Sequence, residues 1–186
     1  MPDGLPRSVA NELLRYVDNV DAGDFHRAGI GRGADEHVNR FVRRDRIHWL
    51  HERRPDLTEW RSFTDALRTQ LNRQLFLGLF SFESHLARYG PGDFYKKHYD
   101  AFRGEANRIV SLVCYLNTDW TPGDGGELLL YSDTITVTVP PAYRTLVLFL
   151  SEETLHEVLP AKRERWSVTG WFRLNQSRLD RVDPPR

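Results

Sequence analysis

The second half of the chain is a succession of short segments with the alternation and composition of β-strands. They are rich in β-branched and aromatic residues, and turns containing Gly, Pro or Asp separate them. Seven or eight strands without intervening helices are typical of a sandwich or jelly roll. The sequence therefore predicts a jelly-roll core over about residues 82–174. The segments are 82–89, 94–100, 108–117, 126–131, 134–139, 145–150, 156–160 and 165–174.

The first half of the chain carries helical patterns instead. Ser8 is placed to cap a helix whose apolar residues, from Val9 to Val17, share one side. A second helix after Pro55 carries one apolar stripe that needs a sheet or helix to cover it. That stripe consists of Leu57, Trp60, Phe63, Leu67, Leu71 and Leu75. Residues 29–50, rich in Gly and Arg, indicate a long charged loop that ends in a strand at 46–50.

These patterns predict one mainly β domain over residues 1–186, with packed α-helices. We expect the N-terminal helices, at about 8–80, to support one sheet of the core, and residues 175–186 to form a polar tail. Lys plus Arg and Asp plus Glu each number 26, so nothing indicates a nucleic-acid partner. No apolar run approaches membrane-spanning length. Cys114 is the only cysteine, which predicts a packed core thiol and a cytoplasmic protein without an intrachain disulfide. We also expect the protein to be a monomer.

His98 and Asp100 flank Tyr99 in the segment 94–100. On a strand both side chains would project from the same face. A solvated surface pair and a metal site both fit this pattern taken alone. His156 opens a late strand-like segment and is placed to face the same interior. Two histidines and one carboxylate on one face form the facial triad of non-haem Fe(II) oxygenases, which makes these three residues candidates for a metal site.

Arg165 begins the last strand-like segment, on one face with Ser167, Thr169 and Trp171. An arginine buried in a barrel is costly unless an anion pairs with it. The carboxylate of a dicarboxylic cosubstrate would supply that anion, since a guanidinium matches a carboxylate in two hydrogen bonds. Tyr115 is placed to donate its hydroxyl to the same carboxylate. An outward-facing surface arginine fits the spacing equally well, because the neighbouring residues are charged.

In this order and spacing, the motifs resemble the 2-oxoglutarate and Fe(II)-dependent dioxygenases. More narrowly, they resemble the prolyl 4-hydroxylase group, which includes the oxygen-sensing prolyl hydroxylases and their bacterial relatives. The resemblance covers about residues 85–173. It is carried by "YGPGDFYKKHYD" (89–100), "VCYLNTDW" (113–120), "GDGGELLLY" (123–131), "RTLVLFLSEETLHEV" (144–158) and "RWSVTGWF" (165–172).

The resemblance implies a double-stranded β-helix fold with His98, Asp100 and His156 as iron ligands. It implies that Arg165 binds the distal carboxylate of 2-oxoglutarate and that Tyr115 assists. The further residues implied to line the cosubstrate pocket and its mouth are Tyr89, Tyr95, Leu128, Thr169 and Trp171.

The implied activity uses Fe(II), 2-oxoglutarate and O2 and releases succinate and CO2, with ascorbate (vitamin C) supporting turnover. A carboxylate at position 100 favours hydroxylation, because related halogenases leave that position vacant. The implied substrate is a proline in a protein or peptide, covered by a loop at 30–46. Arginines 40, 43, 44 and 46 would steer an acidic partner. Two alternatives stay open: a hydroxylase of a free amino acid or other small molecule, and a non-catalytic iron-binding sensor module.

Overall fold

The computed structural model describes residues 1–29, 39, 41–51, 54–101 and 107–175. The elements are α1 (Arg7–Asn19), the 3-10 helix η1 (Ala22–Asp24), β1 (His26–Arg27), β2 (Arg46–Leu50), α2 (Thr58–Leu75), β3 (Ser81–Tyr89), β4 (Tyr95–His98), β5 (Arg108–Tyr115), β6 (Leu128–Tyr131), β7 (Thr136–Val139), β8 (Leu146–Leu150), β9 (Leu155–Val158) and β10 (Arg165–Arg173). The short strand β1 has no counterpart in the sequence prediction, whereas the strand predicted at 46–50 is confirmed as β2.

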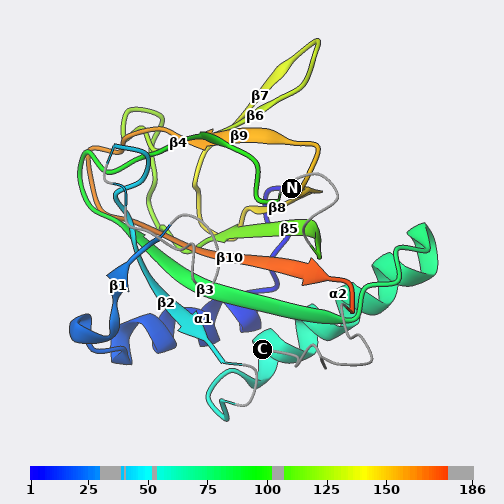
Figure 1. Ribbon diagram of the computed structural model, residues 1–186. Helices are drawn as coiled ribbons and strands as arrows, with labels where there is room; N and C mark the ends of the chain where they lie inside the picture. Colours follow the sequence, from blue (N-terminus) through cyan, green and yellow to red (C-terminus); the bar gives the residue numbers. More distant parts are fainter. Residues whose placement is uncertain (30–38, 40, 52–53, 102–106, 176–186) are drawn as a thin grey trace.

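The strands form two antiparallel sheets that face one another. The larger sheet has the order β1-β2-β3-β10-β5-β8, and the smaller one has the order β4-β9-β6-β7. In Figure 1 both helices lie against one face of the larger sheet, and the smaller sheet lies over the other face. This arrangement confirms the predicted mainly β jelly roll with N-terminal helices supporting one sheet.

The larger sheet is buried on both faces, so its strands alternate between two apolar clusters. In β5, Leu112 and Cys114 pack toward the helices, and Cys114 is the predicted core thiol. Val113 and Tyr115 point into the space between the sheets. Because neighbouring residues of a strand face opposite ways, one strand serves the supporting core and the interior of the jelly roll together.

The two helices begin differently from the sequence prediction. Helix α1 starts at Arg7, with Pro6 as an N-cap at φ −56° and ψ 143° that makes no side-chain capping hydrogen bond. Ser8 therefore lies inside the helix, and its hydroxyl donates to Glu59 instead of capping. The apolar stripe of α2 also ends earlier than predicted. Leu75 is 58% exposed, since the C-terminal end of α2 extends past the sheet in Figure 1.

In the described ranges, neither α1 nor α2 combines the length and the apolar composition required of a membrane-crossing helix. The predicted loop at 30–46 lies largely outside the described residues, as does Arg40.

The first turn of α2 is capped by a residue of α1. The N-cap residue of α2, Leu57, offers no side-chain acceptor. The buried carboxylate of Glu12 replaces it, accepting from the backbone N–H groups of Glu59 at 2.9 Å and of Trp60 at 2.7 Å. An anion at this end of a helix also complements the helix dipole. Glu12 thus joins the two helices that support the sheet.

Replacement of Glu12 by Ala is expected to lower the free energy of unfolding by about 2–3 kcal/mol, because two N–H groups lose a charged acceptor. Glu12→Gln keeps one acceptor and should lose less. Asp18→Ala removes an exposed carboxylate from the same helix and should change stability by under about 0.5 kcal/mol. Urea unfolding of the three variants measures this, and equal stability of Glu12→Ala and Asp18→Ala would contradict the proposed cap.

Candidate metal and cosubstrate site

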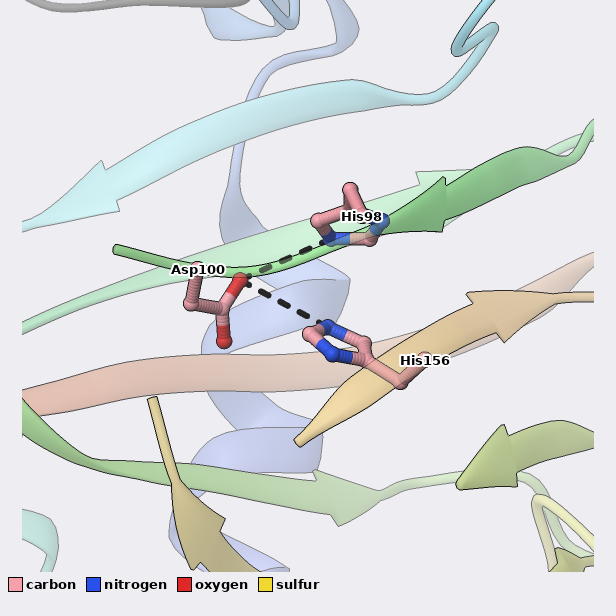
Figure 2. Close-up of side chains that lie close together, drawn as sticks. All are labelled: His98, Asp100 and His156. Atoms are coloured by element: carbon pink, nitrogen blue, oxygen red, sulfur yellow. Dashed lines mark ion pairs between the residues drawn. The ribbon is translucent and has the colours of Figure 1, made fainter. Parts of the chain in front are cut away.

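His98, Asp100 and His156 come together between the two sheets. His98 ends β4 and is paired in register with His156 of β9. The strand ends at His98, so Asp100 lies just beyond it. The sequence prediction that Asp100 is part of the strand is therefore wrong. The three ligand atoms nevertheless lie within 4.8 Å of one another. Figure 2 shows Oδ1 of Asp100 directed at both imidazoles, 3.5 Å from each Nε2.

The ring orientation of both histidines is fixed through their other nitrogen. Nδ1 of His98 lies 2.8 Å from the carbonyl oxygen of Lys96, and Nδ1 of His156 lies 2.9 Å from that of Thr154. A carbonyl only accepts, so Nδ1 carries the proton in the neutral ring. A ring with its proton on Nδ1 carries its lone pair on Nε2, which is the form in which histidine binds a metal.

The charges of the cluster depend on its burial and on the short distances within it. Burial opposes ionisation of Asp100, but the charge and hydrogen bonds of His156 and His98 outweigh it and hold its pKa well below the usual range. Burial lowers the pKa of His98. For His156 burial acts the same way, but the charge of Asp100 prevails and raises its pKa. The site therefore keeps an anionic carboxylate in a space where its side chain is 8% exposed.

Aromatic rings pack on both histidines and restrict their rotation. The ring of Tyr95 stacks on His98 with centroids 3.5 Å apart and an interplanar angle of 13°. Phe149 packs against His156 at 4.7 Å. Tyr95 thus contacts a candidate metal ligand directly, which refines its predicted place in the pocket lining.

Arg165 lies at the other end of the same interior and is 1% exposed. The alternative of an outward-facing surface arginine is therefore wrong. Its Nε donates to the carbonyl of Gly126 at 2.9 Å and its Nη1 to Ser167 Oγ at 3.3 Å. Among the described residues no carboxylate forms an ion pair with it. A buried guanidinium held only by neutral acceptors fits an anionic ligand.

The hydroxyl of Tyr115 completes the donor set next to Arg165. The guanidinium carbon lies 5.0 Å from the centre of the Tyr115 ring. Within the described part of the chain, the buried Tyr115 hydroxyl has no hydrogen-bond partner. Burial raises the pKa of Tyr115 to about 12, against the opposing charge of Arg165, so the hydroxyl keeps its proton and donates. These two residues fit the carboxylate of a dicarboxylic cosubstrate.

The remaining predicted pocket residues divide between the two ends of the interior. Tyr89 lies under the Arg165 guanidinium at 4.8 Å, and Leu128 is buried in the same apolar cluster. Thr169 and Trp171 share the inner face of β10 but lie four and six residues further on, roughly 13 and 20 Å along the strand. Trp171 pairs in register with Ser111, and so belongs to the Asp100 end.

Two buried serines near Asp100 were missed in the sequence. Ser111 Oγ donates to Asp100 Oδ2 at 2.6 Å and lies 2.9 Å from Ser151 Oγ. The sequence contained an indication of Ser111, because it is a hydroxyl residue in an otherwise apolar strand and lies on the same face as Tyr115. Nothing in the sequence indicated Ser151, which lies in a turn after β8.

Comparison with known proteins places these features in a family. The model of the 2OG-Fe(II) oxygenase superfamily matches residues 84–173. A crystal structure of a Pseudomonas putida prolyl-4-hydroxylase superimposes with a TM-score of 0.83 and 39% identity, over 94% of this chain and 90% of that chain. A Trichoplax adhaerens prolyl hydroxylase, in complex with a hypoxia inducible factor oxygen degradation domain peptide fragment, gives a TM-score of 0.81 and 27% identity. That match covers 93% of this chain and 81% of that chain.

Among curated proteins, the hypoxia-inducible factor prolyl hydroxylase of Caenorhabditis elegans is 33% identical over 97 residues. This match covers 50% of the chain but only 13% of the worm protein. The chain thus spans a small part of the curated relatives that it matches. The chain matches 90% of the P. putida structure at 39% identity, and the family model matches the region that contains the site. The chain therefore belongs to the 2OG-Fe(II) oxygenase superfamily.

The first test of the site is metal binding. Loss of one imidazole leaves two donors, so His98→Ala and His156→Ala should each weaken Fe(II) binding at least tenfold. His51→Ala removes an exposed histidine and should leave affinity unchanged. Anaerobic titration with Fe(II), or with Mn(II) as a redox-stable substitute, measures all three. Unchanged metal affinity in both site variants would exclude the cluster as the metal site.

Proposed function

We propose that this protein is an Fe(II)- and 2-oxoglutarate-dependent prolyl hydroxylase that acts on a proline in a protein or peptide. One observation carries this proposal. A triad of side chains that can bind a metal and a buried arginine that fits a carboxylate ligand lie in the same interior, within the region that matches the superfamily. A non-catalytic metal-binding module does not require this buried arginine.

In this proposal His98, Asp100 and His156 hold the iron. Arg165 and Tyr115 bind the distal carboxylate of 2-oxoglutarate. When bound with O2, the iron and 2-oxoglutarate supply the oxidising chemistry that hydroxylates a C–H bond and releases succinate and CO2. The protein orients these groups and keeps water away from them, because apolar side chains line the space between the two ends. Those side chains include Val113, Leu128, Val147 and Val158.

The choice of a peptidyl proline rests on the relatives. Two solved structures that align over most of the chain are prolyl hydroxylases, and one of them contains a peptide fragment. Hydroxylation of a free amino acid or other small molecule is the competing proposal. A monomeric state, a cytoplasmic location and support by ascorbate stay predictions.

The arginines before β4 divide into two groups. Arg43 forms a two-pronged pair with the buried Asp45, 2.6 Å at its shortest, and its guanidinium lies over Tyr95 at 4.2 Å. It therefore supports the site from within and does not face a partner, contrary to the sequence prediction. Arg44 and Arg46 are exposed and, with Arg27, line a hollow of about 370 Å³. Asp93 is the carboxylate in that lining, and it also accepts from Gly90 N–H.

The proposed cosubstrate pocket predicts separate effects on 2-oxoglutarate and on iron. Arg165→Lys loses the two-pronged contact and should weaken 2-oxoglutarate binding about ten- to hundredfold. Tyr115→Phe should weaken it by about 0.5–1.5 kcal/mol, the value of one hydrogen bond. Fe(II) affinity should stay unchanged in both. Calorimetric titration of the metal-loaded protein measures 2-oxoglutarate affinity, and titration of the metal-free protein measures Fe(II) affinity.

Two matched substitutions control for the residue types. Arg88→Lys changes an arginine of β3 that pairs with Glu164, and Tyr143→Phe removes a hydroxyl that donates to Asn11. Both should bind 2-oxoglutarate as the unchanged protein does. Full affinity in Arg165→Lys would overturn the pocket assignment.

The substrate class is tested with 2-oxoglutarate turnover and mass spectrometry. We expect one oxygen to be added to proline in peptides and none to free proline. If an acidic segment flanks the target proline, Arg27→Glu and Arg46→Glu should raise the KM of such a peptide and reduce its dependence on salt. Peptide-independent 2-oxoglutarate turnover should not change. Arg7→Glu, on α1, provides the same charge reversal elsewhere, and an equal effect there would refute a local role of the hollow.

A further inference from the structure

Asp100 has two oxygens with different surroundings. Oδ1 faces Nε2 of His98 and Nε2 of His156, at 3.5 Å from each. Oδ2 accepts a short hydrogen bond from Ser111 Oγ at 2.6 Å. The two oxygens of the carboxylate therefore have different roles. Oδ1 is directed at the candidate metal position, and Oδ2 is directed at Ser111 of β5.

The hydrogen bond from Ser111 has a defined direction because a hydroxyl carries one hydrogen. An ionised carboxylate only accepts, so the hydrogen of Ser111 points to Asp100. The contact of 2.9 Å between the two serine oxygens must then be donated by Ser151. Both serines are 0% exposed. The buried chain therefore runs from Ser151 to Ser111 to Asp100.

The backbone fixes both serines in place. Ser111 lies within β5, in register with Phe149 of β8 and Trp171 of β10. The backbone N–H of Ser151 donates to the carbonyl of Ile109 at 3.0 Å, which anchors the turn after β8 to β5. Asp100, by contrast, lies beyond the end of β4 and lacks a strand to hold it. The serine pair supplies the rigid support that the carboxylate lacks.

We propose that Ser111, supported by Ser151, is a positioning residue that holds Oδ2 of Asp100 away from the metal, so that Oδ1 alone is offered with the two imidazoles. This inference rests on the proposed function, since it assigns Asp100 as a ligand. A facial triad keeps three positions open only if its carboxylate contributes one oxygen. Ser111 thus protects the position that a two-oxygen carboxylate would take from the cosubstrate or O2.

Ser111→Ala is nearly the same size and tests the hydroxyl alone. It should weaken Fe(II) binding about ten- to hundredfold, as is typical for loss of a group that orients a ligand. It should also shift the visible absorption band that forms when 2-oxoglutarate binds the Fe(II)-loaded protein under anaerobic conditions. Ser151→Ala should change both in the same direction but less, because Ser111 still donates to Asp100. Ser111→Thr restores a hydroxyl and should return both toward the unchanged protein.

The control is Ser84→Ala, which removes a buried serine that accepts from Trp60 on the helix side of the same sheet. It should leave metal affinity and the absorption band unchanged even if the melting temperature falls. The inference is overturned if Ser111→Ala has the same Fe(II) affinity and the same absorption band as the unchanged protein. If the unchanged protein binds Fe(II) and 2-oxoglutarate, that result refutes the role of Ser111 alone. If it binds neither, the proposed function and the inference fail together.

Discussion

The pairing of β10 with β3 on one side and β5 on the other is the interaction on which the rest of the structure depends. This pairing sets Arg165 beside Tyr89 and sets Ser167 between Ala87 and Tyr115. It also directs Val168 and Phe172 to the opposite face, where the helices cover them. A shift of one residue would send the guanidinium into the helix-facing core and bring an apolar side chain into the cosubstrate pocket. Support of the fold and placement of the site are thus consequences of one register.

The interior holds charge at both ends, and the two ends are compensated differently. At one end the carboxylate of Asp100 lies among two imidazoles and a serine hydroxyl, so its charge is stabilised within the protein. At the other end Arg165 has only a carbonyl and a hydroxyl as acceptors in the described structure. A buried cation without a counter-charge is unfavourable. A dianionic ligand reaching from the metal end would relieve this, which links cosubstrate binding to the stability of the folded chain.

The sequence predicted what depends on alternation and composition. The strand pattern predicted the jelly roll, and the parity of residues 165, 167, 169 and 171 predicted that they share one face of β10, although not that this face points inward. Among seven histidines, His98 and His156 were selected with Asp100 because their motifs resemble those of the dioxygenases. The end of β4 at His98 could not be predicted, since the extent of the strand depends on its pairing with β9, and the register of that pairing shifts between Tyr95 and His98. Neither could the role of Arg43, because its partner Asp45 was one of several acidic neighbours in a charged loop. Ser151 depends on a turn contact between β8 and β5 that no local pattern records.

The cap that Glu12 provides for α2 has a consequence for the order in which the chain folds. Isolated helices of this length are marginal in water, and the first turn of α2 has no acceptor of its own. Its acceptor lies 47 residues earlier, on a helix whose apolar face is covered only once the sheet exists. The central strand of that sheet, β10, follows every other described helix and strand in the chain. The sheet that covers both helices is therefore complete only after β10 is synthesised, and a nascent chain stopped before β10 would hold residues 7–75 without a lasting structure.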